Sequence, residues 1–101
     1  MEIRHFHYIR TIYEMGSISR AAEKLYISQP SLSQCIKKVE TELGVRLFDR
    51  SQTPLALTPA GTIYVRQAKE ILRIQQSLVQ EVADLSELRT GSLTIGSSRT
   101  R

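Results

Sequence analysis

Hydrophobic positions between residues 3 and 43 recur at helical spacing in three short segments. In the third, four apolar residues follow one another at intervals of four, three and four, namely Leu32, Ile36, Val39 and Leu43. This spacing places them on one face of a helix. Ser28 precedes the segment as a natural N-cap, and Gly44 follows it as a natural stop. Pro30 falls in the first turn, where its missing N–H costs nothing.

Two helices are expected before this one. The segment from Ile3 to Met15 keeps its apolar residues largely on one side, namely Ile3, Phe6, Ile9, Ile12 and Tyr13. Gly16 ends it, and Ser17 can cap a second helix whose apolar face includes Ala22 and Leu25. Tyr26 and Ile27 make the turn into the third helix. Two helices joined by so tight a turn predict a helix-turn-helix.

Beyond Gly44 the pattern changes to two short extended segments. Leu47 and Phe48 lie before the polar run 51–54, and Leu55 and Leu57 lie after it. Apolar segments around a polar turn predict a β-hairpin. The fold class is therefore expected to be mainly α, a winged helix-turn-helix with a three-helix core plus a β-hairpin wing.

A long helix should follow, because Thr58 can cap it and Pro59 suits its first position. It is expected to run to about Leu88. Apolar positions alternate at intervals of four and three, as in a coiled-coil seam. About 30 residues span about 45 Å, too far for this small domain to cover, so a partner helix is predicted. The candidate dimerisation residues are Tyr64, Ala68, Ile71, Leu72, Gln75, Leu78, Val82 and Leu85. The alternative is a long helix that packs only on its own domain or is frayed at its end.

The face of the third helix opposite its apolar stripe carries the candidate chemistry. Its N-terminal part has amides and hydroxyls and no acid, and Lys37 and Lys38 follow. Amides and hydroxyls can hydrogen-bond base edges in a major groove, and lysines can contact phosphates. A solvated face is the simpler interpretation of a lone helix. The helix-turn-helix favours DNA, because that motif brings the N-terminal residues of its second helix to the bases.

The stretch AAEKLYISQPSLSQCIKKVETELGVRLFDR, residues 21–50, resembles the DNA-binding segment of LysR-type transcriptional regulators. The resemblance extends in register from about Ile3 to Ile95. It implies a sequence-specific bacterial regulator domain that binds double-stranded DNA at an interrupted inverted repeat. It also implies a homodimer paired through the linker helix, with a tetramer left open for the full-length protein. Both activation and repression remain open.

Two sets of DNA contacts are expected. The base-reading set comprises Gln29, Pro30, Ser31, Ser33 and Gln34. The phosphate-binding set comprises Ser17, Ser19, Lys37, Lys38, Arg46 and Arg50. The family resemblance supports Arg50 most, because L-F-x-R closes the family motif. Many relatives carry arginine at the position of Gln34 and further basic residues at the wing tip, which Ser51, Gln52 and Thr53 lack.

The chain is expected to divide into three parts. Residues 1–58 would form the winged helix-turn-helix, and residues 59–89 the linker helix. The sequence GSLTIG within residues 90–101 is similar to the first strand of the family's effector-binding domain. A lone strand cannot satisfy its own backbone, so these residues are expected to be disordered. A small-molecule effector would bind only through the missing C-terminal domain.

Composition limits the number of domains and the classes of partner and compartment that the chain could have. The 101 residues suit one small domain, and 14 Lys and Arg against 10 Asp and Glu give a net charge of +4 and a pI near 9.6. One cysteine excludes a disulfide framework. No apolar run reaches membrane length and no signal-peptide core is visible, so a cytoplasmic protein without membrane contact is expected.

Enzymatic, metal and cofactor chemistry is not expected. His5 and His7 fall on different helix faces and are interpreted as surface or flanking histidines, not a metal site. Ser28, Ser31 and Ser33 lack a recognisable histidine base. Cys35 lies beside the buried stripe, where an inert thiol is favoured over a redox role. A coiled-coil adaptor with an incidental basic face remains the alternative to a DNA-binding domain.

Overall fold

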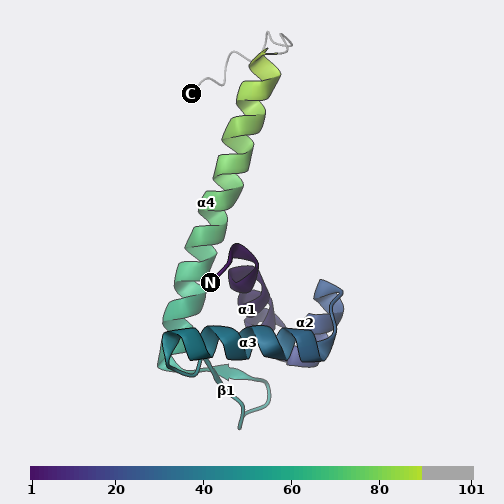
Figure 1. Ribbon diagram of the computed structural model, residues 1–101, viewed down its shortest axis with the longest axis vertical. Helices are drawn as coiled ribbons and strands as arrows, with labels where there is room; N and C mark the ends of the chain where they lie inside the picture. The colour runs from purple at the N-terminus through teal and green to yellow at the C-terminus, as the bar shows by residue number, and fades with distance from the viewer. Residues whose placement is uncertain (90–101) are drawn as a thin grey trace.

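The computed structural model describes residues 1–89, and its elements follow the predicted order. The helices and strands are α1 (Ile3–Met15), α2 (Ile18–Leu25), α3 (Gln29–Leu43), β1 (Phe48–Asp49), β2 (Ala56–Leu57) and α4 (Pro59–Arg89). The short helices and the hairpin gather at one end of α4, and the rest of α4 extends away from them (Figure 1). The predicted fold class, a mainly α winged helix-turn-helix with a long C-terminal helix, is confirmed. The prediction for residues 90–101 lies outside the described residues.

Local signals start and end the short helices as expected. The Ser17 hydroxyl accepts a hydrogen bond from the Arg20 N–H at 3.2 Å, and the Ser28 hydroxyl accepts one from the Ser31 N–H at 3.2 Å. Gly44 ends α3 with a φ of 75°. Glycine adopts this left-handed conformation without the steric cost that other residues meet. The helix-turn-helix is thus framed by signals within the sequence itself.

Tyr26 makes the turn between α2 and α3 in an unusual backbone conformation. Its φ of 59° lies in the left-handed region, which disfavours residues with a Cβ atom. Its N–H bonds back to the carbonyl of Ala22, and its side chain is 94% exposed. The side chain therefore gains almost nothing from burial, while the backbone carries the strain of the tight turn.

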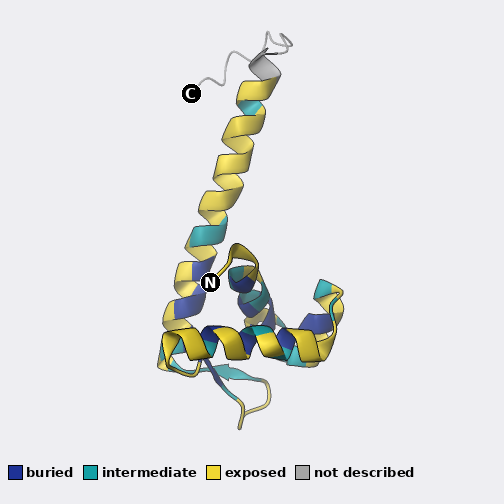
Figure 2. Cartoon of the chain, in the orientation of Figure 1, coloured by how far each residue is buried: buried dark blue, intermediate teal, exposed yellow. Residues whose placement is uncertain are grey.

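The core forms where α1, α2, α3 and the first turns of α4 meet. Its buried hydrophobic residues are Ile9, Ile12, Ala21, Ala22, Leu32, Ile36, Val39, Leu47, Phe48, Tyr64, Val65 and Ala68. Figure 2 shows buried positions along the near part of α4 and mostly exposed positions beyond it. A single small core thus holds the helix-turn-helix, the wing and the start of the long helix together.

Three apolar residues expected on buried faces lie at the rim of this core. Leu43 is 43% exposed, Tyr13 42% and Ile3 40%. Leu43 occupies the last turn of α3, just before the chain turns away at Gly44. Tyr13 keeps its ring near the Lys69 ammonium, 5.8 Å from the ring centroid. Helical periodicity gave the right side for these residues but could not show where the core ends.

The prediction that His5 is a surface residue is wrong. Its residue is 2% exposed, and its Nδ1 accepts the Glu2 N–H at 3.0 Å. The histidine thereby satisfies one of the free N–H groups at the start of α1. Burial, the largest influence, lowers the pKa of His5 from its ordinary value. The neutral ring is the form that can accept this hydrogen bond.

Thr58 and Gly61 join the wing to α4. The Thr58 hydroxyl accepts the Gly61 N–H at 3.0 Å and donates to the Arg46 carbonyl at 2.7 Å. A Cβ atom at Gly61 would lie 2.0 Å from the Leu47 carbonyl oxygen. Only glycine permits the backbones to approach this closely. This junction fixes the base of the wing beside the long helix.

Candidate nucleic-acid interface

The apolar side of α3 fixes which residues the helix presents to solvent. Leu32, Ile36 and Val39 are fully buried. Most base-reading candidates are exposed, and Ser33 is half-buried; the exposed ones are Gln29, Pro30, Ser31 and Gln34. The structure therefore leaves the N-terminal end of α3 accessible along the predicted face. The Ser31 hydroxyl also accepts from Ser28 at 2.9 Å, so it takes part in the helix cap.

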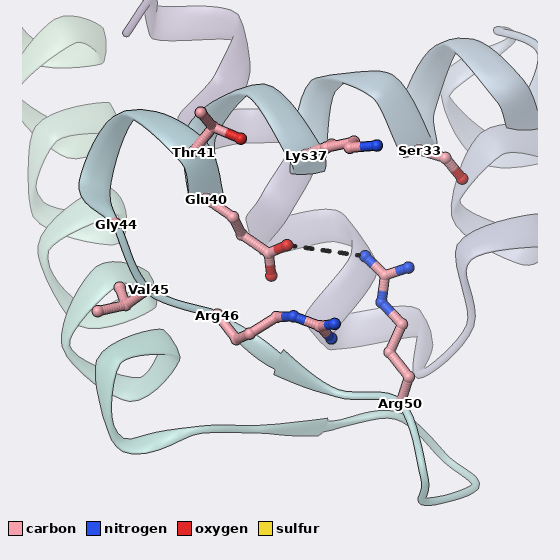
Figure 3. A pocket seen from close by; sticks show the side chains of 8 residues that line it. All are labelled: Ser33, Lys37, Glu40, Thr41, Gly44, Val45, Arg46 and Arg50. Carbon is pink, nitrogen blue, oxygen red and sulfur yellow. Dashed lines mark ion pairs between the residues drawn. The ribbon is translucent and has the colours of Figure 1, made fainter.

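A groove of about 660 Å³ separates α3 from the wing. Ser33, Lys37 and Glu40 line it from α3, and Arg46 and Arg50 line it from the other side (Figure 3). Three of the predicted phosphate-binding cations, Lys37, Arg46 and Arg50, thus face one hollow. Their summed charge would attract a phosphate backbone lying against this surface.

A smaller hollow of about 270 Å³ continues the surface toward α2. Ser17, Ser19, Gln29 and Arg50 line it together with the wing residues Gln52 and Thr53. The structure therefore brings the two predicted serines beside the start of α3 and beside Arg50. Ser17 is the N-cap of α2, and its hydroxyl lies 3.3 Å from that of Ser19. A helix N-terminus with hydroxyls beside it is suited to bind a phosphate.

Lys38 lies on the opposite flank of α3, beside a residue that the sequence analysis missed. A hollow there is lined by Gln34, Lys37, Lys38 and Arg4 of α1. The Arg4 side chain is 59% exposed and pairs with Glu2 at 3.2 Å. Nothing in the periodicity of α1 indicated that Arg4 would lie beside α3, since this contact depends on how the two helices pack. Arg4 extends the basic surface.

Hydrogen bonds to the carboxylate of Asp49 hold the tip of the wing in a defined turn. The Asp49 carboxylate accepts hydrogen bonds from the Ser51 hydroxyl at 2.6 Å, the Ser51 N–H at 3.0 Å and the Gln52 amide at 3.2 Å. These bonds, the Ser51 hydroxyl foremost, lower the pKa of Asp49. The sequence showed that the tip lacks basic residues, and the structure adds that it is a folded polar turn.

The dimerisation candidates divide into two groups along α4. Tyr64 is 7% exposed and Ala68 is fully buried, both within their own domain. Ile71 and Leu72 are half-buried, and Gln75 is exposed. Leu78 is 60% exposed, Val82 57% and Leu85 56%, with Ile74 and Val79 beside them at 54% and 60%. Only the later positions leave apolar surface for a partner, so Tyr64 and Ala68 serve the core of the domain.

Other uses of the described residues would be metal binding, membrane insertion or thiol chemistry. The side chains described for residues 1–86 include no group of three or more His, Cys, Asp or Glu placed to hold a metal. Across the same residues, no helix combines the length and the apolar character needed to cross a membrane. Cys35 is a half-buried free thiol in α3.

A helix-turn-helix with a wing, basic grooves and an accessible second helix defines a winged helix-turn-helix DNA-binding domain. Residues 3–62 match the family described as bacterial regulatory helix-turn-helix protein, lysR family. The chain belongs to this family and is a LysR-type helix-turn-helix DNA-binding domain.

Among curated proteins, the chain is 42% identical over 99 residues to the HTH-type transcriptional regulator BsdA of Bacillus subtilis. This match covers 97% of the chain and 34% of BsdA, so the chain spans about a third of that relative's length. The structure is similar to the BenM DNA-binding domain bound to catB site 1 DNA, with a TM-score of 0.82 and 35% identity over 85% of this chain and 97% of that one. It is also similar to the CbnR DNA-binding domain bound to DNA, with a TM-score of 0.79 and 30% identity over 85% and 99% of the two chains.

Proposed function

We propose that this chain binds double-stranded DNA as a homodimer and reads the two halves of an interrupted inverted repeat. The observation that carries this proposal is the convergence of the predicted contacts on one surface, running from Ser17 and Gln29 across α3 to Arg46 and Arg50. The DNA complexes of the similar BenM and CbnR domains support it.

The N-terminal part of α3 would enter the major groove. Gln29, Ser33 and Gln34 would contact base edges, and Ser31 and Pro30 would lie against the same bases. A glutamine at position 34 suits adenine, because its amide can both donate to and accept from that base. Relatives with arginine at this position would favour guanine by the same geometry. Gln34 is thus the residue most able to set this chain's own sequence preference.

Phosphate contacts would flank the reading helix. Lys37, Arg46 and Arg50 would meet one strand from the groove beside the wing. Ser17 and Ser19 would bind phosphate at the start of α2, and Lys38 would do so on the other flank. Contacts of this kind add affinity for any sequence and weaken as salt rises.

The far part of α4 would join the two copies. Its exposed apolar residues from Ile74 to Leu85 match the spacing of a coiled-coil seam. Charge favours an antiparallel pair, since the stretch 66–73 carries three cations, Arg66, Lys69 and Arg73, against the single acid Glu70, while Glu81 and Asp84 are the charged residues along the seam. In an antiparallel pair these acids would face the partner's basic half. Two copies should then meet half-sites about 10 bp apart or at a multiple of that spacing.

The longer protein would use this domain to activate or repress transcription in the bacterial cytoplasm. Residues 1–58 would be its DNA-binding domain and residues 59–89 its linker helix. An effector-binding domain would follow from residue 90 and sense a small molecule. A tetramer of the longer protein is the second assembly to test beside the dimer.

Selection of duplexes from a random pool tests this proposal, using the 101-residue chain at moderate salt. We expect enrichment of an inverted repeat. Gln34→Ala should relax one symmetric position, and Lys38→Ala should weaken all sequences alike and reduce the salt dependence by about one charge. Binding without an enriched sequence would mean that the surface acts only through its charge, and the base-reading roles would be withdrawn.

A further inference from the structure

We propose that Glu40 is a positioning residue for DNA binding, which holds the Arg50 guanidinium at the mouth of the groove between α3 and the wing. This inference rests on the proposed function, because Arg50 is there assigned to a phosphate. Glu40 is acidic, yet it lies on the surface that is proposed to bind the negatively charged DNA backbone.

The two oxygens of Glu40 have different partners. Oε2 accepts the Leu47 N–H at 2.8 Å, and Oε1 lies 4.0 Å from Nη2 of Arg50. The carboxylate therefore ties the last turn of α3 both to the start of the wing and to a side chain that leaves the hairpin. Figure 3 shows Glu40 pointing into the groove between α3 and the wing, toward Arg50.

The surroundings of Glu40 explain why an acid is tolerated there. Lys37, Arg46 and Arg50 line the same groove, so three cations surround a single carboxylate. The Glu40 side chain is 11% exposed, whereas that of Arg50 is 42% exposed. The acid thus lies behind the arginine, where it offsets repulsion among the cations, and the guanidinium stands toward the solvent from which DNA would approach.

The loose ion pair leaves Arg50 free to bind a second group. A guanidinium has five N–H donors in a planar fork, and a contact at 4.0 Å occupies one nitrogen at the long limit of an ion pair. The other donors remain for a phosphate. Restricting a long side chain before binding lowers the entropy lost when the complex forms, and this is the contribution assigned to Glu40.

Glu40→Gln separates this role from support of the backbone. The amide oxygen can still accept the Leu47 N–H, while the charge that restrains Arg50 is lost. Leu47 is fully buried, so Glu40→Ala would leave its N–H unsatisfied and would confuse the two roles. Glu42→Gln is the matched control, because it removes the same charge from α3 at an exposed residue paired with the N-terminus.

The test measures Kd for a duplex selected by the wild-type chain, at several salt concentrations. Glu40→Gln should raise Kd about twofold to fivefold, the range expected for a partly exposed ion pair. It should also reduce the salt dependence toward that of Arg50→Gln. In the Arg50→Gln background, Glu40→Gln should have no further effect. Glu42→Gln should leave Kd unchanged or lower it slightly. Thermal unfolding of each variant reports its stability.

Unchanged or tighter binding by Glu40→Gln would overturn the inference, as would an equal loss in the Arg50→Gln background. If Glu40→Gln does not fold, Glu40→Asp replaces it, since aspartate keeps the charge but falls one methylene short of both Arg50 and the Leu47 N–H. Loss of the Leu47 contact would persist in the Arg50→Gln background, so only the part of the loss that depends on Arg50 is assigned to positioning. That part should equal the loss expected of Glu40→Gln. Failure of the wild-type chain to bind any duplex would instead overturn the proposed function, and this inference with it.

Discussion

The apolar side chains at the two ends of α4 differ in burial, although the helix is continuous. In its first turns, Tyr64, Val65 and Ala68 are buried by the rest of the domain. In the distal segment, residues 71–86, Leu78, Val79 and Val82 each expose more than half of their surface. We call the part formed by residues 3–70 the head. The head completes its own core, while the distal segment carries apolar surface that its own chain does not cover.

One periodic pattern of apolar residues along α4 thus serves two purposes, the core of the domain and a surface left for a partner. The spacing of four and three continues from residue 64 to residue 85, with Gln75 as the polar position in it, so periodicity alone assigns these residues to a single seam. Packing against α1 divides them, because the ring centroid of Phe6 in α1 lies 5.5 Å from that of the buried Tyr64. Leu78 and Val82, by contrast, are exposed. Changes in the head should therefore act on folding, and changes in the distal segment should act on assembly.

Gly61→Ala should have the largest effect, and it concerns the head. The new methyl group would lie 2.0 Å from the Leu47 carbonyl oxygen, so we expect a loss of about 3 kcal/mol or more in the free energy of unfolding. Urea denaturation measures it. Gly44→Ala is the control, because no atom lies within 4 Å of its new methyl group and only backbone strain of about 1 kcal/mol is added. Equal losses would contradict the proposed crowding at Gly61.

Leu78→Glu should leave the head folded and weaken pairing of two chains. Each copy would lose about 1.5 kcal/mol of apolar burial, so the dimer dissociation constant should rise about a hundredfold or more. Sedimentation equilibrium measures this constant, and thermal unfolding monitors the head. Gln76→Glu adds the same charge about 160° around the helix from Leu78 and should change dimerisation little. Retained DNA binding by a monomer would favour a head that acts alone.

Tyr26→Gly should stabilise the head slightly. Glycine relieves the strain of a φ of 59°, and a side chain that is 94% exposed loses almost no burial. We expect a gain of about 0.5–1 kcal/mol in the free energy of unfolding. Tyr26→Ala keeps a Cβ atom and should give no such gain. A similar gain from alanine would show that the tyrosine side chain, not the backbone, is unfavourable.

The free energy of unfolding of the head should depend on pH, and this effect should be smaller than those of the substitutions above. Burial lowers the pKa of His5 below its ordinary value of 6.5, so the unfolded chain binds more protons in that range. The contribution of His5 to stability is then complete above pH 6.5 and decreases as the pH falls through the lowered pKa. Urea denaturation at pH 7 and pH 5 measures it. His5→Gln should reduce this dependence, whereas His7→Gln, at an exposed position, should retain it.

Much of the head could be predicted because its signals are local. Ser17, Ser28 and Gly44 mark helix ends through contacts within a few residues. Each amphipathic helix also carries its own period. The accessible face of α3 followed directly, since the residues opposite a buried stripe must be exposed.

The features that sequence reasoning missed depend on contacts between elements. Glu40 gains its role only because the wing returns beneath α3, and Arg4 joins the basic surface only because α1 crosses beside Lys38. The burial of His5 follows from the same packing. Tyr64 and Ala68 could not be separated from Leu78 without knowing where α1 lies. A linear pattern shows which face of a helix is apolar and leaves open what covers it.

The number of chains bound to one selected duplex distinguishes a DNA-bound dimer from a monomer. Sedimentation of the complex between the 101-residue chain and a duplex with both half-sites gives this number. We expect two chains on the full site, joined through the distal segment, and a large loss of affinity when one half-site is scrambled. A single chain on the full site, with affinity that survives the scrambled half, would contradict this expectation.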